Sequence, residues 1–146
     1  MQNNYVLEMK TVQISPMRTL MTALKDILLE TNIIFSQELV SKDGKVSPAG
    51  IRIINMDKSH TILAHLFLDA FKFEHFYCKY PKIIIGVNMF HLFKLINTID
   101  NDDTLTIYIE EKDYSDGIVE YLGLKFENGD IKQMKIQKLK LIEPDE

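Results

Sequence analysis

Two amphipathic segments, placed about half a chain apart, restrict the fold of this sequence more than any other feature. One follows Ser15 and begins at Pro16, and the other follows Asn88 and continues to about Ile99. Serine and asparagine are favoured at helix N-caps, and proline is tolerated in the first turn, so we predict two helices. Their apolar residues recur at helical spacing and predict one buried stripe on each helix. These residues are Met17, Leu20, Met21, Leu24, Ile27 and Leu28 in the first, and Met89, Leu92, Phe93 and Ile96 in the second.

The rest of the chain has the pattern of short strands joined by turns. Residues 104–110, for example, alternate apolar and polar side chains with the period of a half-buried strand. Residues 41–47 are polar and contain a glycine, which predicts a turn or loop. The other predicted strands are 5–13, 32–40, 51–55, 61–69, 74–79, 82–87, 118–126 and 131–142. The order strand, helix, strands therefore occurs twice, which indicates an internal duplication and an α+β fold with both helices on one side of antiparallel sheets.

Composition limits the classes of protein to which the chain can belong. Its 146 residues fit one domain, and 46% of them are hydrophobic, which is enough for a core. A single cysteine, Cys78, excludes an internal disulfide. No run of about 18 apolar residues is present. The net charge of −4 argues against a protein that coats nucleic acid, although one basic face is compatible with it.

We expect no enzymatic activity, no cofactor and no metal site. His75 and Cys78 are three residues apart on a predicted strand, so their side chains point to opposite faces and cannot form a nucleophile and base pair. The four histidines lack metal-ligand spacing, and no phosphate-binding glycine motif occurs.

Four short segments resemble those of the proliferating-cell-nuclear-antigen family, the eukaryotic-type DNA sliding clamps. The segment 56–60 (MDKSH), followed by a strand, resembles the family's Met-Asp-x-Ser-His segment. Residues 76–78 (FYC) and 85–88 (IGVN) resemble the region before its second helix, and 23–26 (ALKD) resembles its first helix. The resemblance extends from about Tyr5 to the end of the chain. It implies the DNA-clamp fold with a duplicated βαβββ unit, an N-terminal clamp domain over 1–142, and the start of an interdomain connector at 143–146, with the second clamp domain absent.

The resemblance also implies a function. Family members are non-enzymatic processivity factors of DNA polymerase that form a ring around duplex DNA without sequence preference and recruit replication and repair proteins through clamp-binding peptides. We therefore expect a full-length homotrimer, a clamp loader as a partner, and a location in the nucleus or at a cytoplasmic viral replication site. The abundance of Ile, Asn and Lys is compatible with an AT-rich genome, such as that of a large DNA virus or a protist.

Basic residues outside the buried stripes are the candidate DNA contacts. Isolated charges of this kind more often belong to ordinary solvated helix faces. The resemblance places Arg18, Lys25 and Lys94 on the inner wall of the ring, with His91 beside them. Such residues would neutralise phosphates without reading bases. Thr19 and Asn97 occupy positions where the family often has lysine, so we expect a less basic wall.

Two further sites follow from the resemblance. A pocket for partner peptides is expected at Met56, His60, Thr61, Leu141 and Ile142. Without the resemblance, a lone histidine would more often be structural and a methionine more often part of the core. The last strand would supply a subunit interface through Lys132, Met134 and Ile136. Lysines on an exposed edge also prevent unwanted strand pairing, and Lys132 replaces an aromatic residue of the relatives, so a weaker ring contact is expected.

Two alternatives to a ring component stay open. One is a monomeric processivity factor of clamp-like fold that does not encircle DNA. The other is an interaction module that keeps the peptide pocket but has no affinity for DNA.

Overall fold

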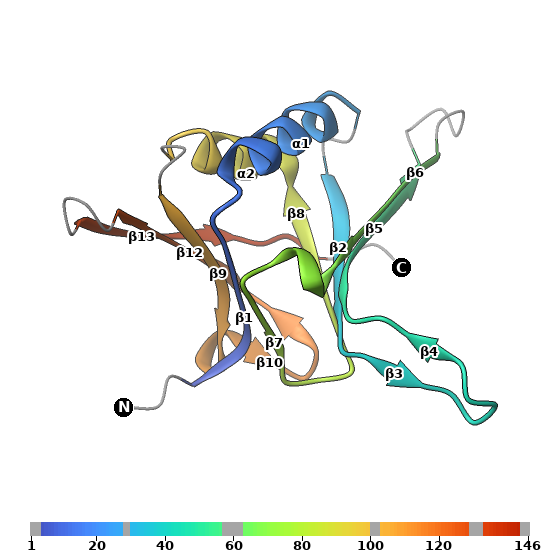
Figure 1. The fold of residues 1–146 in the computed structure, drawn as a ribbon. Helices are drawn as coiled ribbons and strands as arrows, with labels where there is room; N and C mark the ends of the chain where they lie inside the picture. The colour runs from blue at the N-terminus through green and yellow to red at the C-terminus, as the bar shows by residue number, and fades with distance from the viewer. Residues whose placement is uncertain (1–3, 28–29, 57–62, 100–102, 129–132, 144–146) are drawn as a thin grey trace.

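The computed structural model describes residues 4–27, 30–56, 63–99, 103–128 and 133–143. Two α-helices lie together over two antiparallel sheets, as Figure 1 shows. The helices are α1 (Ile14–Ile27) and α2 (Met89–Ile96). The main strands are β1 (Tyr5–Thr11), β2 (Glu30–Ser36), β5 (Gly50–Met56), β6 (Leu63–Asp69), β7 (His75–Cys78), β8 (Lys82–Asn88), β9 (Thr104–Glu110), β12 (Tyr121–Asn128) and β13 (Gln133–Lys140). The short elements are β3 (Leu39–Val40), β4 (Val46–Ser47), β10 (Tyr114–Ser115), β11 (Ile118–Val119), and the 3-10 turns η1 (Ala70–Lys72) and η2 (Glu111–Asp113).

The order of the strands confirms the predicted duplication and reveals an exchange between its halves. One half is β1, α1, β2, β5 and β6, and the other is β8, α2, β9, β12 and β13. The sheets have the orders β6-β5-β2-β8 and β13-β12-β9-β1-β7. The first strand of each half therefore pairs within the sheet of the other half, and β7 extends the β1 edge. This exchange fixes the two halves to each other through backbone hydrogen bonds.

The hydrophobic core lies between the helix pair and the inner faces of both sheets. Strand alternation selects its members: in β2 the side chains of Ile33 and Phe35 are buried, whereas Ile34 is only partly so. From the helices, Met21, Leu24, Met89, Leu92 and Ile96 are buried, which confirms the predicted stripes for these residues. None of the described helices is long and apolar enough to cross a membrane.

The two helix starts differ in how well the sequence predicted them. Asn88 caps α2 as predicted, because its side chain accepts a hydrogen bond of 3.1 Å from the backbone N–H of His91. The prediction that Ser15 caps a helix beginning at Pro16 is wrong, because α1 begins at Ile14. The hydroxyl of Thr11 instead accepts from the N–H of Gln13 at 3.0 Å. Pro16 thus lies in the first turn, where its missing N–H leaves no bond unmade.

One predicted loop contains regular structure. Residues 41–47 were expected to form a turn or loop, but Val46 and Ser47 pair with Leu39 and Val40 in a two-stranded ribbon, β3–β4. Gly44 adopts a φ of +86° in the connecting turn, which is the left-handed region that glycine favours. In Figure 1 this ribbon projects from the four-stranded sheet on the side away from the helices.

Candidate nucleic-acid and partner interfaces

The outer face of the helix pair is polar and carries more positive than negative charge. The helices hold three cations, Arg18, Lys25 and Lys94, against one carboxylate, Asp26. The whole chain has a net charge of −4. The helix layer is therefore more positive than the rest of the molecule, as a surface that faces phosphates requires.

Lys94 and His91 both lie exposed on the outer face of α2, where the sequence placed them. The ammonium of Lys94 lies 5.2 Å from the ring centroid of Phe90, which is 46% exposed. The rings of Phe90 and His91 are 6.4 Å apart. Asn97 follows on the same face and is also exposed. Lys94 is thus available to solvent and is restrained by a weak cation–π contact.

Lys25 is less exposed, and its charge is more engaged, than its position in the sequence suggested. Its side chain is 23% exposed, and its ammonium forms a 2.8 Å ion pair with the adjacent Asp26. The same ammonium lies 4.9 Å from the ring centroid of Phe93. The charge of Lys25 is therefore partly compensated within the helix layer.

Arg18 connects the two helices. Its guanidinium donates a hydrogen bond to the backbone carbonyl of Ile99, which lies beyond the C-terminal end of α2. The side chain is partly buried, and its Nε atom is enclosed. Unsatisfied carbonyls at a helix C-terminus attract cations. Arg18 consequently has a structural contact that its helical position alone did not predict.

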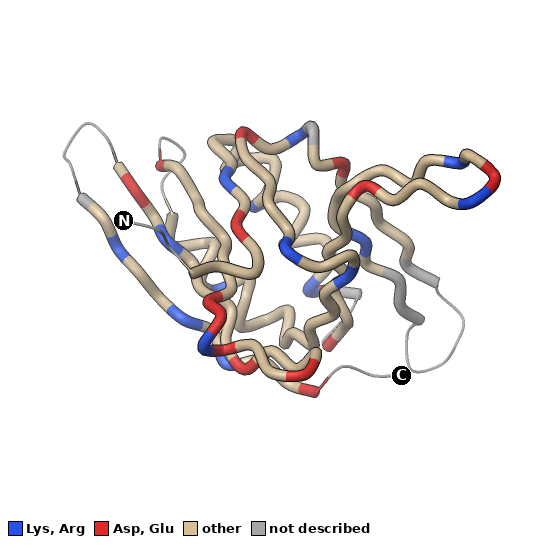
Figure 2. Tube along the Cα trace, turned by 90° about the horizontal axis from the view of Figure 1, so that it is seen from below, with Lys and Arg blue, Asp and Glu red and all other residues tan. Residues whose placement is uncertain are grey.

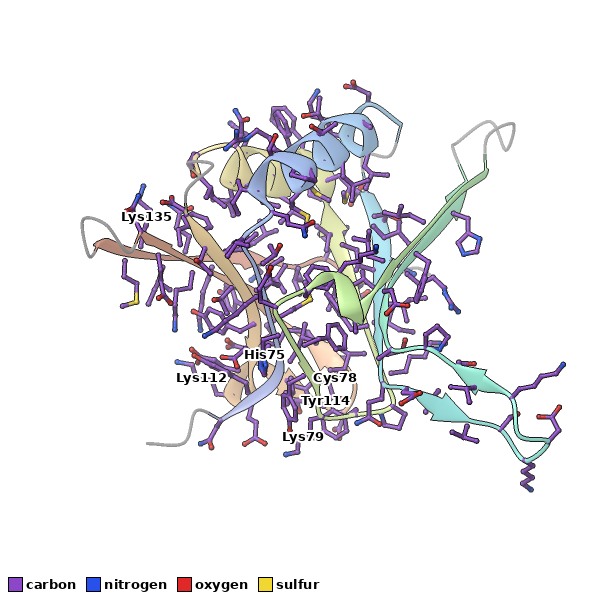
Figure 3. All side chains as sticks on the ribbon, in the orientation of Figure 1. His75, Cys78, Lys79, Lys112, Tyr114 and Lys135 are labelled. Atoms are coloured by element: carbon purple, nitrogen blue, oxygen red, sulfur yellow. The ribbon has the colours of Figure 1, made fainter. Side chains whose placement is uncertain are left out.

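Lys135 is a further cation on the helix side of the sheet, and it was not among the DNA contacts expected from the sequence. It pairs across the strands with Phe126, whose side chain is buried in the inner face. Figure 3 shows its side chain on β13 directed towards the level of the helices. The alternation of side chains along β13 shows that Lys135 and Ile136 lie on opposite faces, but only the register with β12 reveals which face is inner.

The expected peptide pocket is described only in part. His60 and Thr61 lie outside the described residues, and of Met56 only the backbone is described, paired with Leu63 at the end of β5. Leu141 is buried in the core at 8% exposure, whereas Ile142 is 37% exposed. The N–H of Ile142 donates to the carbonyl of Gly86 at 3.0 Å. This bond places the segment after β13 against β8, in the same sheet as Met56.

The expected subunit interface corresponds to an exposed sheet edge. Strand β13 ends the five-stranded sheet, and its second edge pairs with no other described strand. Met134 and Ile136 are 58% and 50% exposed on this strand. Lys132 lies outside the described residues. Large apolar side chains on an open edge are typical of a surface that pairs with another chain.

The far end of the molecule holds a polar cluster without catalytic geometry. His75 contacts Glu8 at 3.0 Å on the outer face of β7, whereas Cys78 is buried and donates from its thiol to the carbonyl of Tyr80. Burial raises the pKa of the Cys78 thiol, so the reactive thiolate forms less readily. Figure 3 shows these residues near Lys79, Lys112 and Tyr114, away from the helices. Within the described ranges, no three potential metal-ligating side chains come together.

The chain is similar to known proteins of one family. Residues 6–146 match the family model described as "Proliferating cell nuclear antigen, N-terminal domain". The chain is 28% identical over 103 residues to a "Probable DNA polymerase sliding clamp" of Acanthamoeba polyphaga mimivirus, covering 70% of this chain and 22% of the relative. It is 29% identical over 103 residues to "Probable DNA polymerase sliding clamp 1" of Paramecium bursaria Chlorella virus 1, covering 70% of this chain and 35% of the relative. It is 27% identical over 141 residues to the "Proliferating cell nuclear antigen" of Chaetomium thermophilum, covering 97% and 48%. The chain thus spans about half or less of the length of these relatives.

Proposed function

Because the chain belongs to the family of the proliferating cell nuclear antigen N-terminal domain, we propose that it is part of a DNA sliding clamp, a non-enzymatic processivity factor of DNA polymerase. The relatives that are named as DNA polymerase sliding clamps support this function. The observation that carries it is the helix layer, which has a net positive charge although the chain as a whole is acidic. Elsewhere basic and acidic residues are intermixed along the chain, as Figure 2 shows. In this proposal the layer lines a ring and faces duplex DNA.

The chemistry of the layer favours weak contact over tight binding. Lys94 is exposed, Lys25 is partly compensated by Asp26, and Arg18 is engaged with Ile99. We include Lys135 with Lys25 and Lys94 in the proposed DNA surface because it projects on the same side. A few cations neutralise phosphates without reading bases, so the clamp can move along DNA.

The proposal is tested by the salt dependence of DNA binding. Binding of the chain to a labelled duplex of about 20 base pairs is followed by fluorescence anisotropy at several salt concentrations. Each lost phosphate contact reduces the slope of log affinity against log salt by about 0.9. We expect the triple variant Lys25→Ala, Lys94→Ala, Lys135→Ala to lose about two to three units of slope, equally for unrelated duplex sequences.

A matched control separates this effect from net charge. The variant Lys42→Ala, Lys45→Ala, Lys112→Ala removes the same charge from exposed positions. Lys42 and Lys45 lie in the turn of the β3–β4 ribbon, and Lys112 lies at the end of the molecule away from the helices (Figures 1 and 3). An equal loss of slope in both variants would show that the helix layer is not the DNA surface.

Partner recruitment and ring closure are proposed on the same basis. Peptides of polymerases and other replication and repair proteins would bind in a pocket formed by Ile142, Met56, His60 and Thr61. The exposed apolar residues Met134 and Ile136 would pair with the next subunit of a trimer, onto which a clamp loader would act. We place this activity in the nucleus or at a cytoplasmic viral replication site. Titration of a clamp-binding peptide against Met56→Ala and His60→Ala variants tests the pocket, with an expected loss of about 1–2 kcal/mol.

A further inference from the structure

We propose that the groove between the β3–β4 ribbon and the outer face of the four-stranded sheet, here named the ribbon groove, binds an extended acidic peptide of a partner protein. The groove has a volume of about 260 Å³. Its floor contains Ile34, Arg52 and Lys82. Its walls include Leu39 and Pro48 of the ribbon side and Pro81 before β8.

Hydrogen bonds at both roots of the ribbon fix the walls of the ribbon groove. At one root, the backbone N–H of Gln37 donates to the carbonyl of Pro81 at 3.1 Å. The side-chain amide of Gln37 also donates to the carbonyl of Cys78 at 2.8 Å. At the other root, the N–H of Ala70 donates to the carbonyl of Ala49 at 3.0 Å. A groove with fixed walls loses little conformational entropy when a ligand binds.

The charges that line the ribbon groove are all positive. Arg52 and Lys82 are its charged lining residues, and no ion pair to a carboxylate is formed by either within the described part of the chain. The guanidinium carbon of Arg52 lies 5.1 Å from the ring centroid of Phe67. This cation–π contact leaves the N–H donors of the guanidinium without a carboxylate partner among the described residues.

One of these donors already lacks an acceptor. The Nε atom of Arg52 is enclosed and has no hydrogen-bond partner among the residues that the structure describes. A buried donor without a partner carries a free-energy penalty, and a carboxylate is the acceptor that fits the guanidinium fork. Because the enclosed Nε is not accessible from the ribbon groove, a ligand carboxylate would accept its charge-assisted bond from the terminal Nη groups of Arg52.

The strand register defines the length of the ligand. Arg52 is opposite Ile34, and Lys82 is opposite Ser36, on the two sides of β2. With strands ~4.8 Å apart and ~3.4 Å per residue, the Cα atoms of Arg52 and Lys82 are separated by ~12 Å, which three to four extended residues span. Ile34 lies between them and is partly exposed. The ligand is thus a segment with carboxylates on both sides of an apolar residue.

The position of the ribbon groove favours a peptide over nucleic acid. Figure 1 places the ribbon away from α1 and α2, the helices proposed to face DNA. The prolines and Leu39 along the walls offer apolar contact, which a phosphate backbone does not use. Peptide binding in the ribbon groove does not require the protein to encircle DNA.

The test uses the 146-residue chain and a blocked hexapeptide, Asp-Glu-Ile-Phe-Asp-Glu, as the probe. Amide chemical shifts of the isotope-labelled protein are followed during titration. We expect shifts at β2, β5, β8 and the ribbon, and binding that weakens with salt because it is electrostatic. The double variant Arg52→Gln, Lys82→Gln should reduce affinity by about tenfold, as expected for the loss of two charge-assisted contacts.

Three controls determine the outcome. The variant Lys42→Gln, Lys45→Gln changes the net charge equally at the ribbon tip, and it should keep its affinity within about twofold, since these lysines lie outside the ribbon groove. The sequence Lys-Lys-Ile-Phe-Lys-Lys should not bind. Equal losses in both variants, or shifts confined to other surfaces, would overturn the proposal. Competition of a DNA duplex for the same amides would assign the ribbon groove to nucleic acid and also overturn it.

Discussion

The guanidinium of Arg18 in α1 donates a hydrogen bond to the carbonyl of Ile99, just beyond α2. The two residues are 81 positions apart. One of the three cations expected to contact DNA is therefore also a connection between the helices. This connection changes the expected effect of substituting Arg18 from a loss of DNA affinity alone to a loss of stability.

Substitution of Arg18 by alanine should lower the free energy of unfolding by about 1.5–3 kcal/mol, the range for a hydrogen bond to a charged group. Lys94→Ala removes an exposed cation from the same layer and should change stability by no more than about 0.5 kcal/mol. Urea denaturation of both variants measures the difference. Equal stabilities would mean that the Arg18 bond contributes nothing to the helix pair.

Gly123 should not tolerate a side chain. It pairs with Tyr108, and a Cβ atom at this position would lie 2.3 Å from Cζ of the Tyr108 ring. Because Tyr108 is buried beside Tyr5, the ring has little room to move. Gly123→Ala should therefore destabilise the fold by about 1–3 kcal/mol, as overpacking does.

A double-mutant cycle checks this cause. Tyr108→Leu removes the clash, so Gly123→Ala should cost clearly less in that background. An unchanged cost would mean that the contact with the Tyr108 ring is not the cause of the destabilisation.

Stability should fall at alkaline pH. Burial raises the pKa of the Tyr108 hydroxyl. The unfolded chain loses this proton near pH 10, whereas the folded protein retains it, so the free energy of unfolding decreases as pH rises above about 10. The hydrogen bond to Asp113 raises the pKa of Lys138, and this ion pair also stabilises at lower pH and is lost at high pH. Urea denaturation between about pH 9 and 11 should show a shallower decline for Tyr108→Phe.

Two residues of β13 that differ in burial should respond differently to truncation of their side chains. Leu139 is 7% exposed and Ile136 is 50% exposed. Leu139→Ala should cost about 2–5 kcal/mol, as for a core leucine. Ile136→Ala should leave the stability of the isolated chain within about 0.5 kcal/mol. A large cost at Ile136, measured in the same denaturation assay, would mean that this edge is already covered within one chain.

The sequence predicted most of the longer elements because local patterns mark them. Residues 104–110 form β9 with the predicted bounds. The strand is not half-buried, however, because Thr106 and Tyr108 on its predicted polar face are buried as well. Asn88 combines a capping side chain with a following apolar stripe, and both are confirmed. Such signals are local, so a single segment is enough to detect them.

The features that escaped prediction depend on distant pairing. The ribbon arises because Val40 and Val46 pair across a polar turn, which by itself resembles a loop. The structural contact of Arg18 requires the two helices to be side by side. Lys135 is assigned to the helix side only by its register with Phe126. Composition and periodicity contain no information on these relationships, because they arise from the tertiary fold.

The pairing of β1 with β9 has a consequence for synthesis. Leu7 is opposite Ile109, so about a hundred residues separate the two partners. At about 5–20 residues per second on the ribosome, β1 waits roughly 5–20 s for its neighbour. The other neighbour of β1, β7, emerges earlier, with Cys78 opposite Leu7. Until β9 is made, Val6, Leu7 and Met9, all buried in the finished fold, therefore lack one side of their sheet. We expect these apolar residues to need protection from aggregation on the nascent chain until β9 emerges.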